Sequence, residues 1–492
     1  MKLCILNTLE IMQDYDSYVI PFFSSKKMAD FFEPEFCNLI NPYIESELFS
    51  GKKGEIYSFT SFFNGTNKHV HIVLVGFGDE ASLSTELIMS SFGKSIVRLQ
   101  TLKAKKPVIF LENLSPAIDK VDYLLKSFKA MILAEYTFEN YQTKEDKTTR
   151  IDFIDIFTQY TEANRCAKRA SLFAKNTIAA RDLVNEPANM LKPSDLAEKA
   201  ISLLDDSNID IKVYNKNEIE KLGMTAFLSV AKGSTSEPKL IVMNYTGDKK
   251  SDEKLALVGK GLTYDSGGYS IKPTDSMITM KSDMAGSAAV IGAMKSIAEA
   301  KLKVNVVGII AACENMISGE AYLPGDLIPS MSGKFIEIVN TDAEGRLTLA
   351  DAVTYAIKNE QATKIVDIAT LTGAVIVALG LDYSGVVCND EHMFSIVEKA
   401  SKISNEKIWR LPFDESIKEK NKSDIADLKN SGGRYAGSST AGAFIGEFVE
   451  EIPWIHIDIA GTSFAEKDQA YCRKGATGYG VELLFNIAAQ VK

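Results

Sequence analysis

Closely spaced cysteines and long apolar runs are missing from this 492-residue chain, and each absence argues against a class of protein. The six cysteines form no Cys-x-x-Cys pair, which argues against a disulfide framework or a thiolate zinc site and indicates a reducing compartment. The longest uncharged apolar run, residues 368–381, is shorter than the roughly 20 residues that a membrane span needs. The first ten residues also lack a secretory profile. We therefore predict a cytoplasmic protein with no membrane partner.

Positive charge is also scarce, since 55 Lys and Arg face 65 Asp and Glu, for a formal net charge of -10. This balance disfavours a dedicated nucleic-acid or anionic-membrane binder. The glycines at 259, 261, 267 and 268 fit neither a phosphate-loop nor a dinucleotide-binding pattern. Ser266 lacks the G-x-S-x-G elbow, and among the four histidines only the distant His456 lies in a motif, so a serine nucleophile is disfavoured.

The chain is too long for one core, which predicts at least two domains. A polar, charged stretch at 142–150 indicates a boundary, so we predict a smaller N-terminal α/β domain at 1–150 and a larger catalytic α/β domain at 151–492. In the first, the patterns predict strands at 69–77 and 107–111 and helices at 86–103 and 121–141. A long helix is predicted to follow at 161–184.

Short, continuous apolar runs in the second domain predict a mixed sheet flanked by helices on both faces. The predicted strands are residues 209–214, 240–245, 255–259, 304–312, 365–369 and 454–459, and the predicted helices are residues 196–204, 287–300, 347–358 and 441–449. The chemically interesting motifs would all lie just past the carboxyl ends of strands, where open α/β sheets build their sites.

Acidic side chains gather in two of these motifs. Asp342 and Glu344 stand two residues apart in Asn340-Thr-Asp-Ala-Glu-Gly-Arg346, and Asp265 and Asp283 lie upstream together with two lysines, Lys260 and Lys272. Clustered carboxylates repel one another unless a cation lies among them, and four exceed what one catalytic ion usually takes. Two divalent ions roughly 3.5–4 Å apart would neutralise them, and a water bridging both ions would become a nucleophile near neutral pH.

Two interpretations of the lysines stay open at this point. One lysine could bind a metal as the neutral amine while the other polarises a substrate carbonyl or steadies an oxyanion. Alternatively, both could merely balance the acidic charge. Arg346 could likewise only pair with Glu344.

Several motifs together resemble the cytosolic leucine aminopeptidase family, over about residues 165–492. Besides the segment at 340–346, the matching segments are residues 185–189, 258–268, 280–284, 367–374, 426–430 and 456–462. Two small departures, Tyr264 in place of a common phenylalanine and Leu323 in place of a basic residue, leave fine specificity open. The resemblance implies a metal-dependent aminopeptidase that releases N-terminal leucine and other apolar residues from short peptides, a role in peptide turnover.

The resemblance also implies roles for single residues. Lys260, Asp265, Asp283 and Glu344 would hold a tightly bound metal ion, and Asp265, Asp342 and Glu344 an exchangeable one, with Mn²⁺ or Zn²⁺ expected. Lys272 would contact the substrate carbonyl and the oxyanion, and Arg346 would anchor a bicarbonate ion that shuttles a proton. The first side-chain pocket would be lined by Met280, Thr370, Leu371 and Gly373.

The family further implies a homohexamer of two stacked trimers and substrates with a free N-terminus, whose α-amino group binds the exchangeable metal. DNA binding is the alternative from a different class, because some bacterial members of the family also act as DNA-binding regulators. The net acidity, and the absence of a basic cluster in residues 1–150, disfavour it here.

Overall fold

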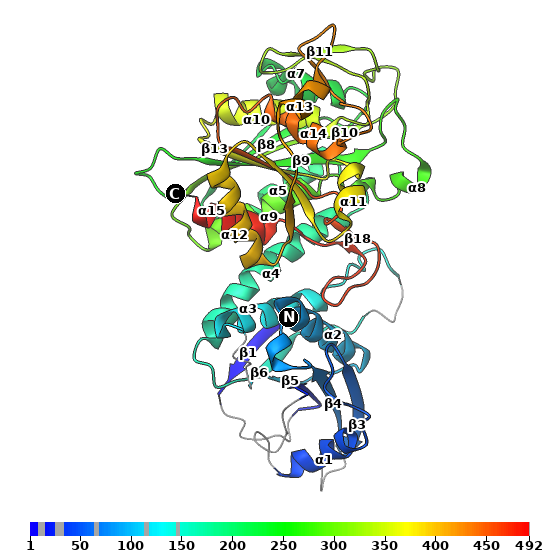
Figure 1. Ribbon diagram of the computed structural model, residues 1–492, viewed down its shortest axis with the longest axis vertical. Coiled ribbons are helices and arrows are strands. Elements are labelled where there is room, and N and C mark those ends of the chain that lie inside the picture. Colours follow the sequence, from blue (N-terminus) through cyan, green and yellow to red (C-terminus); the bar gives the residue numbers. More distant parts are fainter. Residues whose placement is uncertain (8–14, 25–33, 63–67, 113–117, 144–147, 492) are drawn as a thin grey trace. The chain divides into compact units, whose positions relative to one another are not determined.

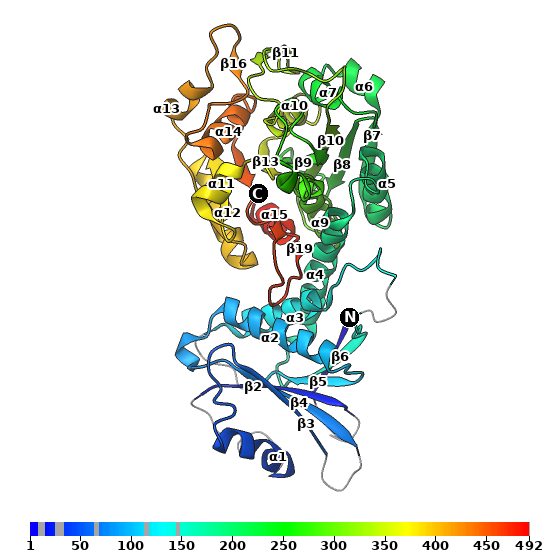
Figure 2. The same cartoon turned by 90° about the vertical axis from the view of Figure 1, so that its right-hand side faces the viewer.

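The computed structural model describes residues 1–7, 15–24, 34–62, 68–112, 118–143 and 148–491, and it divides into two compact units (Figures 1 and 2). The first unit contains Met1–Lys175 and Lys467–Lys474, and the second contains Asn176–Glu466 and Gly475–Lys492. Both are α/β structures, and the second is the larger, so the predicted fold class is confirmed.

The first unit is built on a six-stranded sheet in the order β1-β6-β5-β2-β4-β3, with only β3 antiparallel to its neighbour among the paired strands. Helices α2 and α3 pack on one face and α1 on the other (Figure 1). The elements are β1 (Lys2–Leu6), β2 (Ser17–Phe22), α1 (Pro34–Glu45), β3 (Ile56–Phe62), β4 (His69–Gly76), η3 (Glu80–Ser82), α2 (Thr85–Thr101), β5 (Pro107–Phe110), α3 (Lys120–Glu135), β6 (Phe153–Phe157) and α4 (Ala163–Asn185), which continues into the second unit.

The predicted strands at 69–77 and 107–111 and the helices at 86–103 and 161–184 are confirmed within two residues at each end. The predicted helix at 121–141 is wrong at its carboxyl end, because α3 stops at Glu135. Tyr136 takes an extended conformation, and its N–H bonds to the carbonyl of Leu133. Aromatic residues beyond that point extend the apolar spacing without extending the helix.

The second unit contains an eight-stranded sheet in the order β15-β14-β17-β13-β9-β10-β8-β7. Its centre, from β17 to β10, is parallel, while β8, β7 and β14 run antiparallel to the neighbour on their inner side. This confirms the predicted mixed sheet. The strands are β7 (Ile209–Tyr214), β8 (Lys239–Thr246), β9 (Leu255–Asp265), β10 (Asn305–Asn315), β13 (Lys364–Ala369), β14 (Ser384–Cys388), β15 (Ile408–Arg410) and β17 (Trp454–Asp458).

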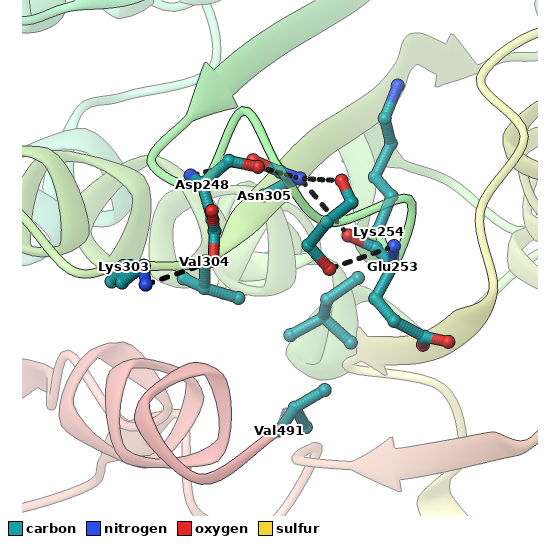
Figure 3. Close-up of a pocket in the computed structure, with 9 residues that line it drawn as sticks. Asp248, Glu253, Lys254, Lys303, Val304, Asn305 and Val491 are labelled. Atoms are coloured by element: carbon teal, nitrogen blue, oxygen red, sulfur yellow. Dashed lines mark hydrogen bonds and ion pairs between the residues drawn. The ribbon is translucent and has the colours of Figure 1, made fainter.

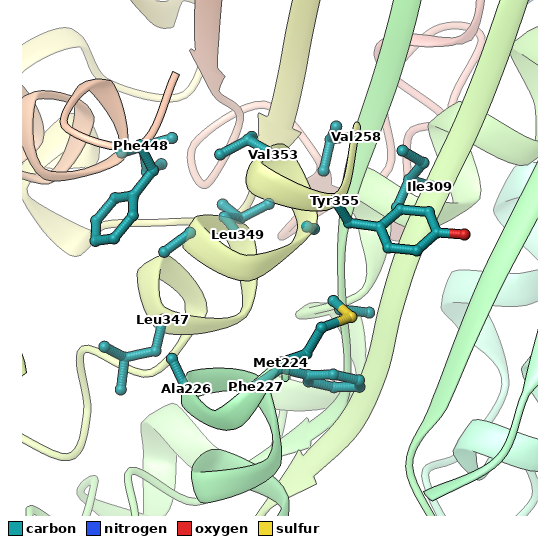
Figure 4. Close-up of a cluster of buried hydrophobic side chains, with 14 of the residues drawn as sticks. Met224, Ala226, Phe227, Val258, Ile309, Leu347, Leu349, Val353, Tyr355 and Phe448 are labelled. Carbon is teal, nitrogen blue, oxygen red and sulfur yellow. The ribbon is translucent and has the colours of Figure 1, made fainter. Parts of the chain in front are cut away.

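Helices cover both faces of this sheet, as predicted. Helices α5 (Pro193–Leu204), α9 (Ala285–Glu299), α12 (Glu391–Ser404) and α15 (Val481–Gln490) pack on one face, and α7 (Thr225–Ala231), α10 (Gly345–Lys358) and α14 (Gly437–Gly446) on the other. On the second face, Leu349 and Val353 of α10 lie over Val258 of β9, with Phe227 of α7 beside them (Figure 4). This close-packed apolar layer fixes the start of α10, where the acidic motif ends.

Shorter elements complete the second unit. They are α6 (Lys216–Lys221), α8 (Thr274–Met277), η4 (Met280–Ser282), α11 (Gly373–Leu379), α13 (Glu415–Lys418) and η5 (Glu419–Asn421), a three-stranded sheet of β11 (Leu327–Pro329), β12 (Phe335–Glu337) and β16 (Leu428–Lys429), and a pair, β18 (Phe464–Ala465) and β19 (Gly475–Ala476). None of the helices in the described part of the chain has both the length and the apolar character needed to cross a bilayer.

Strand β9 differs from its prediction, since it runs to Asp265 instead of ending at Gly259. A side chain at Gly259 would overlap α9, because its Cβ would lie 2.7 Å from Cα of Ser287. The glycine therefore lets the strand continue while the helix packs against it. As a result Lys260 lies inside a strand, and the prediction that every motif residue follows a strand end was wrong for this residue.

Candidate active site

Four carboxylates and two lysines converge at the carboxyl ends of β9 and β13. Asp265 is the last residue of β9, and Lys260 points from inside the same strand. Asp283 ends the turn η4 just before α9, while Asp342 and Glu344 lie between β12 and α10. Strand β12 belongs to the small three-stranded sheet, so this acidic pair reaches the site from outside the main sheet.

Ion pairs join these side chains into one network. The ammonium group of Lys260 lies 2.8 Å from Oδ1 of Asp283 and 2.9 Å from Oε1 of Glu344. The ammonium group of Lys272 lies 2.8 Å from Oδ2 of Asp265 and also pairs with Oδ1 of Asp342. Lys260, Asp265, Asp283 and Glu344 are almost completely buried, whereas Lys272 and Asp342 retain some exposure.

Burial and mutual charge shift the ionisation of the whole network. Burial opposes a charged amine, yet the surrounding carboxylates outweigh it and raise the pKa of both lysines above their usual value. Burial and then the charge of Glu344 raise the pKa of Asp265 and Asp342. Burial would also raise the pKa of Glu344, but the two lysines lower it. When all are ionised, four carboxylates and two ammonium groups leave a net charge of -2, which favours added cations.

The arrangement of oxygen atoms fits a metal site. Asp265, Asp342 and Glu344 each offer an oxygen, and these oxygens lie within 4.8 Å of one another. Oδ2 of Asp283 and Oε2 of Glu344 are buried without a hydrogen-bond partner in the described structure. Unpaired buried carboxylate oxygens are costly unless something binds them. Hard or borderline divalent cations prefer such oxygen ligands.

Arg346 lies at the start of α10, two residues after Glu344, and is also buried. Its Nη1 donates to the carbonyl of Asn430 at 2.7 Å, while its Nε has no hydrogen-bond partner among the described residues. Burial lowers the pKa of Arg346 to about 10, against the opposing charges of Glu344, Asp458 and Asp342. A buried guanidinium with a free donor suits a small anion.

The predicted pocket residues lie on two segments beside the network. Met280 begins η4, which leads to Asp283. Thr370 follows β13, and its hydroxyl donates to Oδ1 of Asp283 at 2.8 Å while its carbonyl accepts from Lys260 at 3.0 Å. Leu371 is half-buried, and Gly373 is exposed at the start of α11. The contacts tie Thr370 directly to the acidic network, and Leu371 and Gly373 continue its turn.

Two buried asparagines support the site, although the sequence assigned them no role. The amide of Asn315 donates to Oδ1 of Asp265 at 2.8 Å and to the carbonyl of Thr341 at 3.0 Å. The side chain of Asn430 accepts from the N–H of Val339 at 2.9 Å, and it donates to the carbonyl of Asn340 at 2.6 Å. Asn430 is the last residue of the family-like segment at 426–430, which could have drawn attention to it, whereas Asn315 lies in none of the family-like segments.

A cavity of about 470 Å³ lies elsewhere in the second unit, beside the amino-terminal ends of β9 and β10 (Figure 3). The amide of Asn305 spans part of its wall, donating to the carbonyls of Asp248 and Ser251 at 2.9 Å each. None of the predicted site residues lines this cavity, which sits at the opposite end of β9 from Asp265. The candidate active site is therefore identified by its buried carboxylates and not by the position of this cavity.

Family models match both parts of the chain. The model of the cytosol aminopeptidase family, catalytic domain, matches residues 178–485, and the model of its N-terminal domain matches residues 19–145. The chain is 45% identical over 480 residues to a probable cytosol aminopeptidase of Clostridium perfringens, covering 96% of both chains. It is 47% identical to the probable cytosol aminopeptidase of Clostridium tetani, covering 91% of this chain and 92% of that protein.

Solved structures with the same fold include two enzymes. A mutant of tomato leucine aminopeptidase matches with a TM-score of 0.88 and 33% identity, covering 100% of this chain and 97% of that chain. The bottromycin maturation enzyme BotP in complex with Mn matches with a TM-score of 0.86 and 26% identity, covering 96% of this chain and 99% of that chain.

Proposed function

The chain belongs to the cytosol aminopeptidase family and is therefore a metal-dependent aminopeptidase, and we propose that it is a leucyl aminopeptidase that acts on short peptides. The observation that carries this proposal is the buried network of four carboxylates and two lysines, whose net charge and unpaired oxygens call for cations. A network built only for stability would not leave buried carboxylate oxygens without partners.

We propose that two divalent ions, Mn²⁺ or Zn²⁺, bind this network. Asp265, Asp283 and Glu344, together with Lys260 as the neutral amine, would hold one, and Asp265, Asp342 and Glu344 the other. The positive charge of the ions would favour this deprotonated form of Lys260, against the carboxylates that raise its pKa in their absence. When bound, the ions supply Lewis acidity and lower the pKa of water, so that it becomes the nucleophile at neutral pH. The solved structure of BotP in complex with Mn supports manganese as one of the two choices.

The remaining polar groups would act on the substrate directly. Lys272 is only partly buried, and its raised pKa keeps it protonated, so it can donate to the substrate carbonyl and stabilise the developing oxyanion. Its contacts with Asp265 and Asp342, two of the proposed metal ligands, place it beside the site where a substrate would bind. The free Nε of Arg346 would bind a bicarbonate ion, a small base that can accept and return protons when it is present.

Substrate choice would follow from the segments around the network. Met280, Thr370, Leu371 and Gly373 would line the pocket for the first side chain, and the half-buried apolar side chains of Met280 and Leu371 would favour leucine and similar residues. The acidic network would bind the free α-amino group of the peptide through the exchangeable ion. We further propose a homohexamer in the cytoplasm that serves peptide turnover, which the names of the relatives support for location.

Hydrolysis of leucylglycine and of its N-acetylated form by the Mn²⁺-loaded protein tests the proposal. We expect release of leucine from the free dipeptide and none from the acetylated one. Alanylglycine and glutamylglycine serve as matched substrates for the apolar preference, and the leucyl peptide should be cleaved fastest. Equal cleavage of the acetylated dipeptide, or no cleavage of any of the peptides, would contradict the proposal.

A further inference from the structure

Asp458 stands at the carboxyl end of β17 and is buried, with 1% of its surface exposed. Its Oδ1 accepts the N–H groups of Leu371 at 3.1 Å, Thr372 at 3.4 Å and Ala460 at 3.2 Å. Its Oδ2 accepts the hydroxyl of Thr372 at 2.6 Å. One carboxylate thus holds two consecutive residues of the turn between β13 and α11.

The residue just before them in this turn is Thr370, which contacts the acidic network. Its hydroxyl donates to Oδ1 of Asp283, and its carbonyl accepts from Nζ of Lys260, which itself lies 2.8 Å from the same Oδ1. Oδ1 of Asp283 is thereby fixed from two sides, while Oδ2 carries no hydrogen bond. Thr370 and Lys260 together therefore leave Oδ2 of Asp283 for an ion.

Neighbouring strands connect the two sets of contacts. Strands β13 and β17 are parallel, and Ala369, the last residue of β13, pairs with Asp458. The turn leaves the sheet directly after this pair, so its path depends on how its first N–H groups are bound. No other acceptor for the N–H groups of Leu371 and Thr372 is found in the described structure.

We propose that Asp458 is a positioning residue for the metal centre: it fixes the turn at 370–372 so that Thr370 aims Asp283 at the ion. This inference rests on the proposed function, because it assumes that Asp283 binds a metal. Thr370 contacts the proposed ligand Asp283 directly, and removal of a group in that position commonly changes metal affinity or activity by about 10- to 100-fold. Asp458 acts one step further back, through the turn that carries Thr370.

A purely structural alternative is that Asp458 only stabilises the fold, since Thr372 also caps α11 by accepting from the N–H of Val375. Asp351 offers a matched control. It is equally buried, at 0% exposed, and it accepts the N–H groups of Phe227 at 2.9 Å and Met331 at 2.8 Å. The contacts of Asp351 lie away from the acidic network. Asp458→Ala and Asp351→Ala therefore both remove a buried hydrogen-bond acceptor, but only Asp458→Ala affects the turn at 370–372.

Titration calorimetry of Mn²⁺ into chelator-treated protein separates the two roles. We expect Asp458→Ala to raise the dissociation constant of the tighter site about tenfold, the low end of the range for groups that contact a ligand, with Asp351→Ala unchanged. Asp458→Asn should stay within about threefold of the wild type, because its amide oxygen can still accept the backbone N–H groups. Equal constants for Asp458→Ala and Asp351→Ala would overturn the inference.

A double variant tests whether the effect passes through Thr370. Thr370→Val removes the hydroxyl that binds Asp283, so adding Asp458→Ala to it should raise the dissociation constant less than Asp458→Ala does alone. Full additivity would contradict a path through Thr370.

If Asp458→Ala does not fold, Thr372→Val, with Thr372→Ser as its hydroxyl-retaining control, carries the same test. Weaker Mn²⁺ binding in the valine variant alone supports the inference, and equal binding in both overturns it.

The same titrations distinguish this inference from the proposed function. If the wild-type protein binds no Mn²⁺, and no Zn²⁺ in a parallel titration, the proposed metal centre itself is contradicted. If the wild-type protein binds Mn²⁺ while Asp458→Ala and Asp351→Ala have equal dissociation constants, the proposed centre stands and only the positioning role of Asp458 is contradicted.

Discussion

The ammonium group of Lys260 lies 2.8 Å from Oδ1 of Asp283, and both side chains are buried. The lysine also contacts Glu344 and the carbonyl of Thr370, so it joins three segments that are far apart in the sequence. A buried charge that loses its partner is strongly destabilising. Loss of this one amine would therefore take the paired cation from two buried carboxylates, Asp283 and Glu344.

Replacing this amine should destabilise the metal-free protein. We expect Lys260→Met to lower the free energy of unfolding by about 3–5 kcal/mol, because Asp283 and Glu344 would lose their buried cation. Urea denaturation in the presence of a chelator measures it. Lys254→Met is the control: its pair with Glu360 at 3.5 Å is partly exposed, and its loss should cost less than about 1 kcal/mol. Equal costs would contradict the role given to Lys260.

Gly345 should be required for the position of the same lysine. A Cβ at this residue would overlap Cε of Lys260 and lie 2.6 Å from its Nζ. We expect Gly345→Ala to lower kcat/KM about tenfold or more, because the amine must move away from Asp283 and Glu344. Gly319→Ala, whose Cβ would meet nothing within 4 Å, should leave the activity unchanged. Full activity of Gly345→Ala would show that the position of the amine is not critical.

Lys272 should affect the reaction step more than substrate binding. Lys272→Met removes the ammonium group. We expect kcat to fall about 100-fold or more while KM stays nearly unchanged, because a contact made only in the transition state is lost. Steady-state kinetics on a leucyl amide measures both constants. Lys303→Met, which removes a largely exposed amine, is the control. A raised KM with an unchanged kcat would instead assign Lys272 to substrate binding.

The buried carboxyl of Asp351 should make stability depend on pH. Burial raises its pKa to about 7, although the N–H groups of Met331 and Phe227 act in the opposite direction. In the unfolded chain its pKa is about 3.9, so folding favours the protonated form. The stability that this group contributes is therefore fully present below about pH 4 and is lost as pH rises through about 7.

Asp351→Asn tests this dependence because the amide has no charge to titrate. We expect the wild type to gain in stability relative to the variant as pH falls from 8 to 5, measured as the difference in free energy of unfolding. The measurement is best made with a chelator present, so that metal binding does not contribute. A difference that stays constant, or grows as pH rises, would contradict the raised pKa.

The sequence predicted the second unit better than the first. Strands such as β13 and β17 are continuous apolar runs buried on both faces, and these give a clear signal. Strand β14 escaped prediction although it is fully buried, because its five residues include Ser384 and Gly385. The carboxyl half of β9 also escaped, because glycines and a lysine interrupt the apolar pattern there. The boundary between residues 150 and 151 stays a prediction.

The candidate site was predicted as a set of residues, and the structure brings the six charged members together. The motifs were enough for that, since all of these residues except Lys260, which lies inside β9, lie in turns or at a strand end near the same edge of the sheet. The contacts of Asn315 and Asp458 could not be predicted, because they depend on which residues of β10 and β17 face the turns at 341 and 371. That information comes only from the register of the strands and the path of the turns.

Hydrolysis of a leucyl chromogenic amide by chelator-stripped protein, with and without added Mn²⁺ or Zn²⁺, tests the central claim most directly. Asp342→Ala is measured alongside, because Asp342 is the most exposed carboxylate of the network and its loss removes an oxygen from the cluster with Asp265 and Glu344. We predict that the stripped wild type is inactive, that metal restores its activity, and that the variant stays inactive with metal. Full activity without metal, or full activity of the metal-loaded variant, would contradict the account.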